Sequence, residues 1–256
     1  MSLFYLPVGR EEEIFRRAWE FQLPLMLKGP TGCGKTRFVQ HMAAQLARPL
    51  VTVSCNEDTS ATDLLGRHLL LGGETRWVDG PVTRAARSGA LLYLDEVAEA
   101  RADALVVIHS LSDHRRELFL DRTGETVVAP TEFMLIVSFN PGYQRSLREL
   151  KPSTRQRFLA LHFDYPNVDQ EVEIVVKESG VDRSQARRLV QIAQKIRNLT
   201  ELSLMESVST RLLVSAGKLL AGGVPPRLAC SSAIAEPLTD DPEARAALRH
   251  LIELGI

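Results

Sequence analysis

Short apolar segments alternate with longer amphipathic segments between residues 25 and 165. Five apolar or β-branched runs, each bounded by Gly, Pro or charged residues, are expected to form strands that are buried on both faces. They lie at residues 25–28, 50–54, 90–94, 133–138 and 159–163. Amphipathic stretches separate them, such as residues 36–46, where apolar side chains recur at helical spacing. This alternation predicts an α/β domain with a parallel sheet flanked by helices.

The pattern changes after Pro166, where only helical periodicity is found. The expected helices lie at residues 169–178, 183–196, 209–220, 226–235 and 242–254. Asp241 is placed to cap the last of them, and Pro242 occupies its first position. We therefore expect two domains, an α/β nucleotide-binding core over residues 1–165 and a small all-helical lid over residues 166–256.

Two segments interrupt the alternation of strands and helices. Residues 67–82 contain Gly72 and Gly73 between two short apolar pieces, and residues 117–129 contain Gly124 at a turn. Both segments are expected to form hairpins that are inserted into the core. Insertions of this kind often carry function.

Composition and charge narrow the class of protein. The 256 residues are 45% hydrophobic and carry a formal net charge of -1, so no global basic field favours nucleic acid or an anionic membrane as a partner. No leader follows Met1, and no apolar run approaches the ~20 residues of a membrane-spanning helix. The three cysteines are scattered and match neither a disulfide framework nor a metal site. We expect a cytoplasmic protein with no nucleic-acid or membrane partner.

A glycine-rich segment joins the first expected strand to the helix that follows it. The segment is Gly29-Pro30-Thr31-Gly32-Cys33-Gly34-Lys35-Thr36. Between a strand and a helix, this spacing predicts a loop whose backbone N–H groups surround phosphate oxygens at the helix N-terminus. Lys35 is expected to contact the β- and γ-phosphates of ATP, and the Thr36 hydroxyl is expected to ligate Mg²⁺.

Two adjacent acids, Asp95 and Glu96, follow the third expected strand. Ligands of open parallel sheets bind at the carboxyl ends of the strands, so these acids are expected beside the phosphates. Asp95 is expected to bind Mg²⁺ directly or through water, and Glu96 to polarise the attacking water. A simple kinase needs no water-activating base, so the pair favours hydrolysis.

Four further polar residues are candidates with less specific signals. Asn140 ends the fourth strand, where it could bond the attacking water or the γ-phosphate, although Asn before Pro also forms turns. Arg155 and Arg157 precede the fifth strand, and Arg211 begins a helix of the last domain. Arginine stabilises the charge of phosphoryl transfer, also when a neighbouring subunit supplies it. Position alone leaves these arginines equally open to being surface charges.

The order of these elements resembles the AAA+ ATPases, and the two hairpins resemble those of MoxR-type members. Several strings are similar to the CbbQ/NirQ/NorQ group over essentially the whole chain. They are Arg76-Trp77-Val78-Asp79-Gly80-Pro81, Tyr93-Leu94-Asp95-Glu96-Val97, Asn140-Pro141-Gly142-Tyr143-Gln144, Gln156-Arg157-Phe158 and residues 28–38, 108–116 and 239–242.

The resemblance implies roles for the less specific candidates. Asn140 takes the sensor-one position, and Arg211 takes the sensor-two position that reaches the γ-phosphate from the lid. Arg157 is the first choice for the finger supplied to a neighbouring subunit, and Arg155 is the second. The resemblance also implies a ring-shaped homo-oligomer, expected to be a hexamer, that works with a partner carrying a von Willebrand factor A domain.

The function implied by the resemblance is ATP-driven remodelling that activates a metabolic enzyme. Rubisco is the favoured client, and a nitric oxide or nitrite reductase is the alternative. A nucleic-acid motor shares this core, but the charges of residues 67–82 are mixed. A monomeric kinase or a GTP switch is a third possibility. The Asp95-Glu96 pair and the helical last third argue against a kinase, and the lack of an Asn-Lys-x-Asp string argues against GTP.

Overall fold

The computed structural model of the chain describes residues 4–140, 150–199 and 207–255. The chain forms two compact units. The sheet unit comprises Gly9–Lys28 and Lys35–His162, and the helical unit comprises Met1–Val8, Gly29–Gly34 and Phe163–Ile256. A domain boundary at residue 165 stays a proposal, because the helical unit also includes most of the glycine-rich loop.

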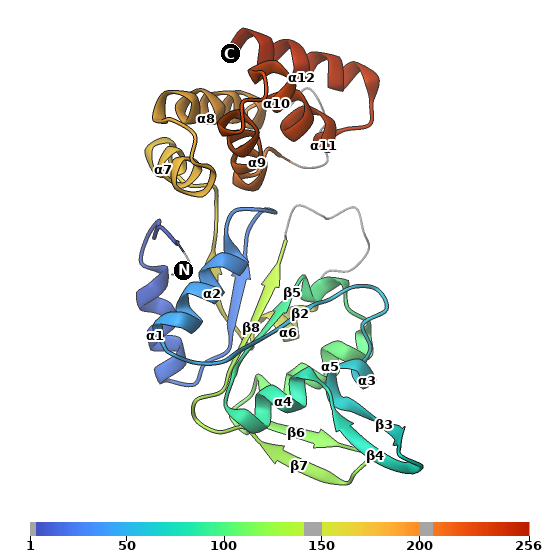
Figure 1. Cartoon of the computed structure of the whole chain (residues 1–256). Helices are drawn as coiled ribbons and strands as arrows, with labels where there is room; N and C mark the ends of the chain where they lie inside the picture. The colour runs from blue at the N-terminus through green and yellow to red at the C-terminus, as the bar shows by residue number, and fades with distance from the viewer. Residues whose placement is uncertain (1–3, 141–149, 200–206, 256) are drawn as a thin grey trace. The chain divides into compact units, whose positions relative to one another are not determined.

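The sheet unit is built on five parallel strands in the order β2-β5-β8-β1-β9 (Figure 1). They are β1 (Leu25–Lys28), β2 (Leu50–Ser54), β5 (Leu91–Asp95), β8 (Met134–Phe139) and β9 (Leu159–His162). Every residue of β8 is buried, as expected for a central strand covered by helices on both faces. The predicted parallel α/β sheet is confirmed, with strand bounds that differ from the expected ones by at most one residue.

Among the described residues, helices and a 3₁₀ turn connect these strands. They are α1 (Glu11–Glu20), α2 (Lys35–Gln45), α3 (Ala61–Leu65), α4 (Pro81–Ser88), a 3₁₀ turn (Val97–Glu99), α5 (Ala102–Leu111) and α6 (Pro152–Arg155). Pro81 occupies the first position of α4, and Gly89 ends the helix in the left-handed conformation. The Phe15 ring of α1 packs edge-to-face on Phe38 of α2, with ring centroids 5.5 Å apart.

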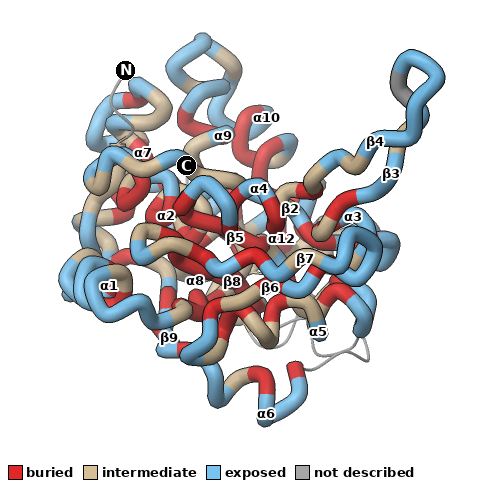
Figure 2. The backbone as a smooth tube through the Cα atoms, turned by 90° about the horizontal axis from the view of Figure 1, so that it is seen from below, coloured by how far each residue is buried: buried red, intermediate tan, exposed pale blue. Residues whose placement is uncertain are grey.

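Both expected hairpins are present as separate two-stranded sheets. The first joins β3 (Gly66–Leu71) to β4 (Glu74–Asp79) through Gly72 and Gly73, whose φ angles of 60° and 84° suit a tight turn between twisted strands. The second joins β6 (Glu117–Leu120) to β7 (Glu125–Val128). Figure 2 shows that the first hairpin extends from its unit and is exposed along most of its length.

Beyond Phe163, the described residues of the helical unit form helices around a core of their own. They are α7 (Val168–Ser179), α8 (Arg183–Arg197), α9 (Thr210–Ala221), α10 (Pro226–Cys230), α11 (Glu236–Leu238) and α12 (Pro242–Gly255). Asp241 caps α12 as predicted, accepting the Ala244 N–H at 2.7 Å. The helix expected over residues 226–235 is present, with α10 at Pro226–Cys230 followed by a π-helical turn at Ser231–Ala235. The turn comes just before Pro237, which lacks the N–H that a regular α-helix would use.

Candidate functional site

The loop that precedes α2 has the backbone of a phosphate-binding loop. Gly29, Gly32 and Gly34 have φ angles of 155°, 69° and 104°, which residues with a Cβ rarely adopt. A Cβ on Gly29 would lie 2.2 Å from the Phe163 carbonyl oxygen, so the close approach of these two backbones requires glycine. Lys35 begins α2 and is buried. The loop therefore runs directly into the N-terminus of α2, where backbone N–H groups can bind phosphate oxygens.

Part of the same loop lies against the start of α9 in the helical unit. A Cβ on Gly32 would lie 2.5 Å from the Ser209 Cβ and 3.6 Å from the Arg211 Cβ. The Tyr165 hydroxyl donates to the Thr31 carbonyl oxygen at 3.1 Å. Arg211 is exposed at the second position of α9. The structure therefore places Arg211 close to Gly32 of the phosphate loop.

In the sheet unit, hydroxyl groups surround the carboxylate of Asp95 at the end of β5. Thr36 Oγ1 donates to Asp95 Oδ2 at 3.1 Å, and the Tyr93 hydroxyl donates to Asp95 Oδ1 at 2.8 Å. Ser138 Oγ also donates to Oδ1, and it accepts the backbone N–H of Glu96 at 2.8 Å. Burial and the nearby Asp95 charge raise the pKa of Tyr93, which keeps this phenol protonated as a donor. Thr36 and Asp95, the two residues predicted to bind Mg²⁺, are thus adjacent.

Tyr93 and Ser138 are site residues that the sequence analysis missed. A sequence signal exists for Tyr93, which lies two residues before Asp95 on the same strand, so both side chains leave the same face. Ser138 follows Val137, the β8 partner of Leu94, and therefore lies level with Asp95. A polar residue at that register in a fully buried strand indicates a polar partner across the sheet.

Glu96 and Asn140 meet at the same edge of the sheet. Glu96 has a left-handed backbone with φ of 54° and an exposed side chain, so the chain turns sharply as β5 ends. Asn140 Nδ2 donates to Glu96 Oε1 at 3.2 Å. The Asn140 Oδ1 atom is buried and has no hydrogen-bond partner in the described parts of the chain. The rest of the Asn140–Gln144 string lies outside the described residues.

The two candidate finger arginines lie in and after α6. Arg155 is the last residue of that helix and is partly buried. Arg157 is exposed, donates to the His109 carbonyl oxygen at 3.3 Å and lies 3.8 Å from Asp113 Oδ2. The contacts with His109 and Asp113 therefore place Arg157 beside the end of α5.

The oxygen donors around Asp95 fit Mg²⁺ bound together with phosphate and water. The Thr36 hydroxyl and the Asp95 carboxylate are hard oxygen donors that already lie 3.1 Å apart. No group of three His, Cys, Asp or Glu side chains that could hold a metal occurs among the described residues. Mg²⁺ commonly binds through one or two such oxygens together with substrate phosphates and water, which matches this set.

Two family models match consecutive parts of the chain. Residues 24–158 match the AAA domain of the dynein-related subfamily, and residues 171–254 match the CbbQ/NirQ/NorQ C-terminal domain. Together they cover most of both units. No described helix is long and apolar enough to cross a membrane.

Known proteins of similar length are more than half identical to this chain. The denitrification regulatory protein NirQ of Pseudomonas aeruginosa is 57% identical, covering 99% of this chain and 97% of that protein. Protein NorQ of Paracoccus denitrificans is 58% identical over 97% of this chain and 92% of its own length. Protein CbbQ of Hydrogenophilus thermoluteolus is 55% identical over 96% and 92%.

Solved structures share the fold at low identity. NtrX from Brucella abortus in complex with ADP superposes with a TM-score of 0.61 at 16% identity, covering 99% of this chain and 64% of NtrX. A mutant of Thermotoga maritima RuvB superposes with a TM-score of 0.57 at 14% identity, covering 96% and 71%.

Proposed function

The chain belongs to the CbbQ/NirQ/NorQ family of MoxR-type AAA+ proteins, and we propose that it is an ATP-hydrolysing ring chaperone that remodels a client enzyme. An AAA domain implies ATPase activity in general. The observation that carries the proposal for this chain is the Asp95 cluster, made of Asp95 and the hydroxyl groups of Thr36, Tyr93 and Ser138. The residue after Asp95 is Glu96, whose carboxylate is exposed. This arrangement supports hydrolysis, since it supplies a metal-binding acid and a base side by side.

The chain's own groups divide the chemistry between them. The N–H groups of residues 29–36 and the Lys35 ammonium would hold the phosphates. Asp95 and Thr36 would hold Mg²⁺, which would neutralise charge on the phosphate oxygens. Glu96 accepts a proton from the attacking water. Asn140 orients Glu96 through its amide N–H, and its buried Oδ1 is an acceptor for that water.

Arginines complete the proposed site. Arg211 contacts the γ-phosphate from the helical unit of the same chain, which its place beside Gly32 supports. Arg157 is supplied to the neighbouring subunit of a hexameric ring, and Arg155 is the second candidate for this role. The exposure of Arg157 supports the first choice, because a finger must reach another chain.

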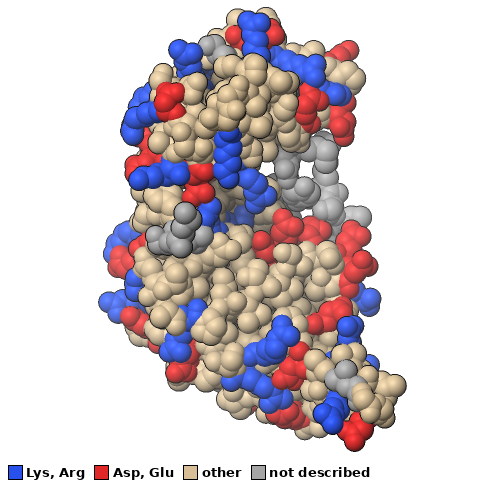
Figure 3. Space-filling model, viewed as in Figure 1, with Lys and Arg blue, Asp and Glu red and all other residues tan. Residues whose placement is uncertain are grey.

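The proposed partners are a von Willebrand factor A domain protein and a client metabolic enzyme in the cytoplasm. The resemblance makes rubisco the favoured client and a nitric oxide or nitrite reductase the alternative. The identities of 57%, 58% and 55% to NirQ, NorQ and CbbQ are nearly equal and support either client. On the face shown in Figure 3, Lys and Arg are interspersed with Asp and Glu. This mixture supports a protein client over nucleic acid or a membrane surface.

Steady-state hydrolysis by Glu96→Gln tests the catalytic assignment. We expect the variant to bind ATP and to hydrolyse it at a small fraction of the wild-type rate, because an amide cannot accept the water proton. Glu57→Gln is the matched control, since Glu57 is an exposed carboxylate just after β2, and it should hydrolyse ATP normally. Normal turnover by Glu96→Gln would overturn the role of Glu96.

Co-expression with a candidate von Willebrand factor A domain partner tests the client. Purified complex is mixed with inhibited rubisco or with an inactive nitric oxide reductase, and ATP turnover and client activity are both followed. The favoured proposal expects both quantities to rise with rubisco only. A response to the reductase alone selects the alternative, and stimulation by DNA or RNA instead would contradict protein remodelling.

A further inference from the structure

The two hairpins of the sheet unit are held in place very differently. The β6–β7 hairpin buries Leu118, Leu120 and Val127 in the hydrophobic core. The β3–β4 hairpin leaves most of its length exposed, with the Leu70 side chain 75% exposed near its tip (Figure 2). An isolated two-stranded sheet is marginally stable, so contacts at the base must fix the direction of β3–β4.

Those base contacts converge on the carboxylate of Asp79 at the end of β4. Trp77 Nε1 donates to Asp79 Oδ1 at 2.7 Å, and Arg87 Nε of α4 donates to Asp79 Oδ2 at 2.9 Å. The Trp77 ring also packs edge-on against His68 of the opposite strand. The indole, the carboxylate and the guanidinium therefore form a chain of hydrogen bonds from β4 to α4.

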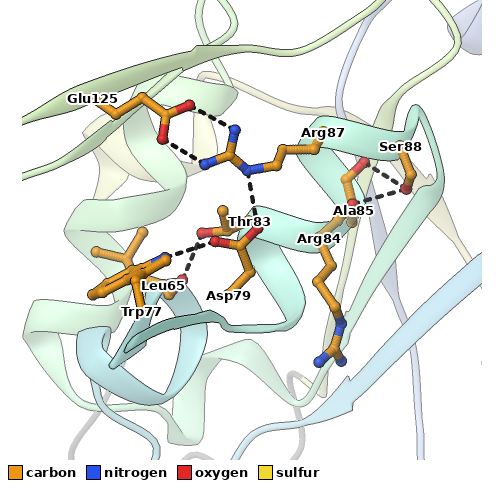
Figure 4. A network of polar contacts seen from close by, with 9 residues as sticks. All are labelled: Leu65, Trp77, Asp79, Thr83, Arg84, Ala85, Arg87, Ser88 and Glu125. Atoms are coloured by element: carbon orange, nitrogen blue, oxygen red, sulfur yellow. Dashed lines mark hydrogen bonds and ion pairs between the residues drawn. The ribbon is translucent and has the colours of Figure 1, made fainter. Parts of the chain in front are cut away.

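The same guanidinium also binds the other hairpin. Both terminal nitrogens of Arg87 donate to the two carboxylate oxygens of Glu125, each at 2.6 Å, at the first residue of β7. Figure 4 shows Arg87 extending between Glu125 and Asp79, while Arg84 of the same helix points away from both. One side chain thus joins Asp79 of the first hairpin to Glu125 of the second.

The chemistry of this contact suits orientation better than global stability. Side-chain exposures of 38% for Arg87 and 43% for Glu125 mean that solvent screens the pair, so it adds little to the stability of the unit. The planar fork of arginine nevertheless fixes two carboxylates in one plane, which a lysine cannot do. The hydrogen bonds from Arg87 also hold the pKa of Glu125 below its ordinary value, so the pair stays charged at neutral pH.

We propose that Arg87 is a positioning residue that fixes the two hairpins relative to each other, so that they move and meet the client as one body. The client part of this inference rests on the proposed function, whereas the coupling of the hairpins does not. Loss of Arg87 should free the exposed β3–β4 hairpin and leave the Asp95 cluster unchanged.

Spin labels at Leu70→Cys and Arg122→Cys, one near each hairpin tip, measure the coupling as a distance distribution. The native cysteines are buried, which favours labelling at the two exposed sites. We expect one narrow distribution in the otherwise unchanged protein and in the control Arg84→Met, and loss of that narrow distribution in Arg87→Met. Arg87→Lys should be intermediate. A narrow distribution in Arg87→Met would overturn the proposal, and Glu125→Ala removes the contact with Arg87 if Arg87→Met fails to fold.

The functional arm compares basal ATPase with activation of the client. Arg87→Met should keep basal ATPase and lose client activation, while Arg84→Met keeps both. Loosened hairpins with normal client activation would refute the claim that the hairpins must act as one body. If the protein without substitutions activates no client, the proposed function fails, and the spin-label result still decides the role of Arg87.

Discussion

The buried ion pair between α7 and α8 offers a sharp test of how the helical unit is held together. Glu171 is fully buried, and Arg197 donates to its two oxygens at 2.7 and 2.8 Å. Thr210 Oγ1 adds a third hydrogen bond at 2.6 Å. The Arg197 guanidinium also lies 4.0 Å from the centroid of Tyr165, whose hydroxyl bonds Thr31 of the phosphate loop. Replacing Glu171 therefore disturbs a network that extends from the lid helices to that loop.

The magnitude follows from burial. Glu171→Met leaves the charge of Arg197 without its partner at a side chain only 12% exposed, which costs about 3–5 kcal/mol. At about 1.4 kcal/mol per factor of ten, amide protection in α8 should fall by roughly two to four powers of ten. The double variant Glu171→Met with Arg197→Met removes both charges and should recover most of this loss.

Hydrogen exchange followed by mass spectrometry on α7 and α8 peptides measures these changes. Arg187→Met is the matched control, because Arg187 pairs with Asp169 between the same two helices at 48% and 75% exposure. That variant should lose about 0–1 kcal/mol. If Glu171→Met costs no more than the control, or if the double variant loses the sum of both single losses, then the pair does not have the structural role described.

Three further predictions concern the nucleotide site. Ser138→Ala should lower kcat on the order of 10²-fold, since Ser138 holds both Asp95 and the Glu96 backbone, with nucleotide affinity nearly unchanged; equal loss in binding would refute this. Gly32→Ala should abolish binding of a fluorescent ATP analogue while the fold persists, because its Cβ would meet Ser209; tight binding would show that the loop can shift. Burial, with Asp95 and Glu96 nearby, raises the pKa of Cys55 from 9.0 to about 12. At pH 8 about one Cys55 thiol in 10⁴ is ionised in the folded protein, so iodoacetamide should label Cys55 only after unfolding. Between pH 9 and 12 the Cys55 thiol is ionised in the unfolded chain but not in the folded one, so the free energy of unfolding should fall as pH rises.

The sheet and the phosphate loop could be predicted because local patterns determine them. Strands buried on both faces are short continuous apolar runs, and a loop that must approach phosphate needs glycine at fixed positions. Both hairpins were also predicted, because Gly72 and Gly73 in one segment and Gly124 in the other indicate turns. The change from α-helix to a π-helical turn after Cys230 was not predicted, because it depends on Pro237 in the segment that follows.

Contacts between distant segments could not be predicted in the same way. Ser138 bonds Asp95 only because β8 lies beside β5, and that neighbour relation is a property of the sheet order. The link from Arg87 to Glu125 joins a helix to a strand far along the chain, without any local periodicity. The pairing of Glu171 with Arg197 is equally non-local, and a buried acid on a helix gives no signal of its partner.

The central claim is that a neighbouring subunit completes each ATPase site, and mixing two inactive variants tests it most directly. Glu96→Gln lacks the base but keeps Arg157, whereas Arg157→Ala keeps the base but lacks the finger. In mixed rings from equal amounts, about a quarter of interfaces would join an intact Glu96 to an intact Arg157. We therefore expect the mixture to recover about a quarter of wild-type ATPase activity. A mixture as inactive as its two components, in rings shown to exchange subunits, would contradict a site shared through Arg157.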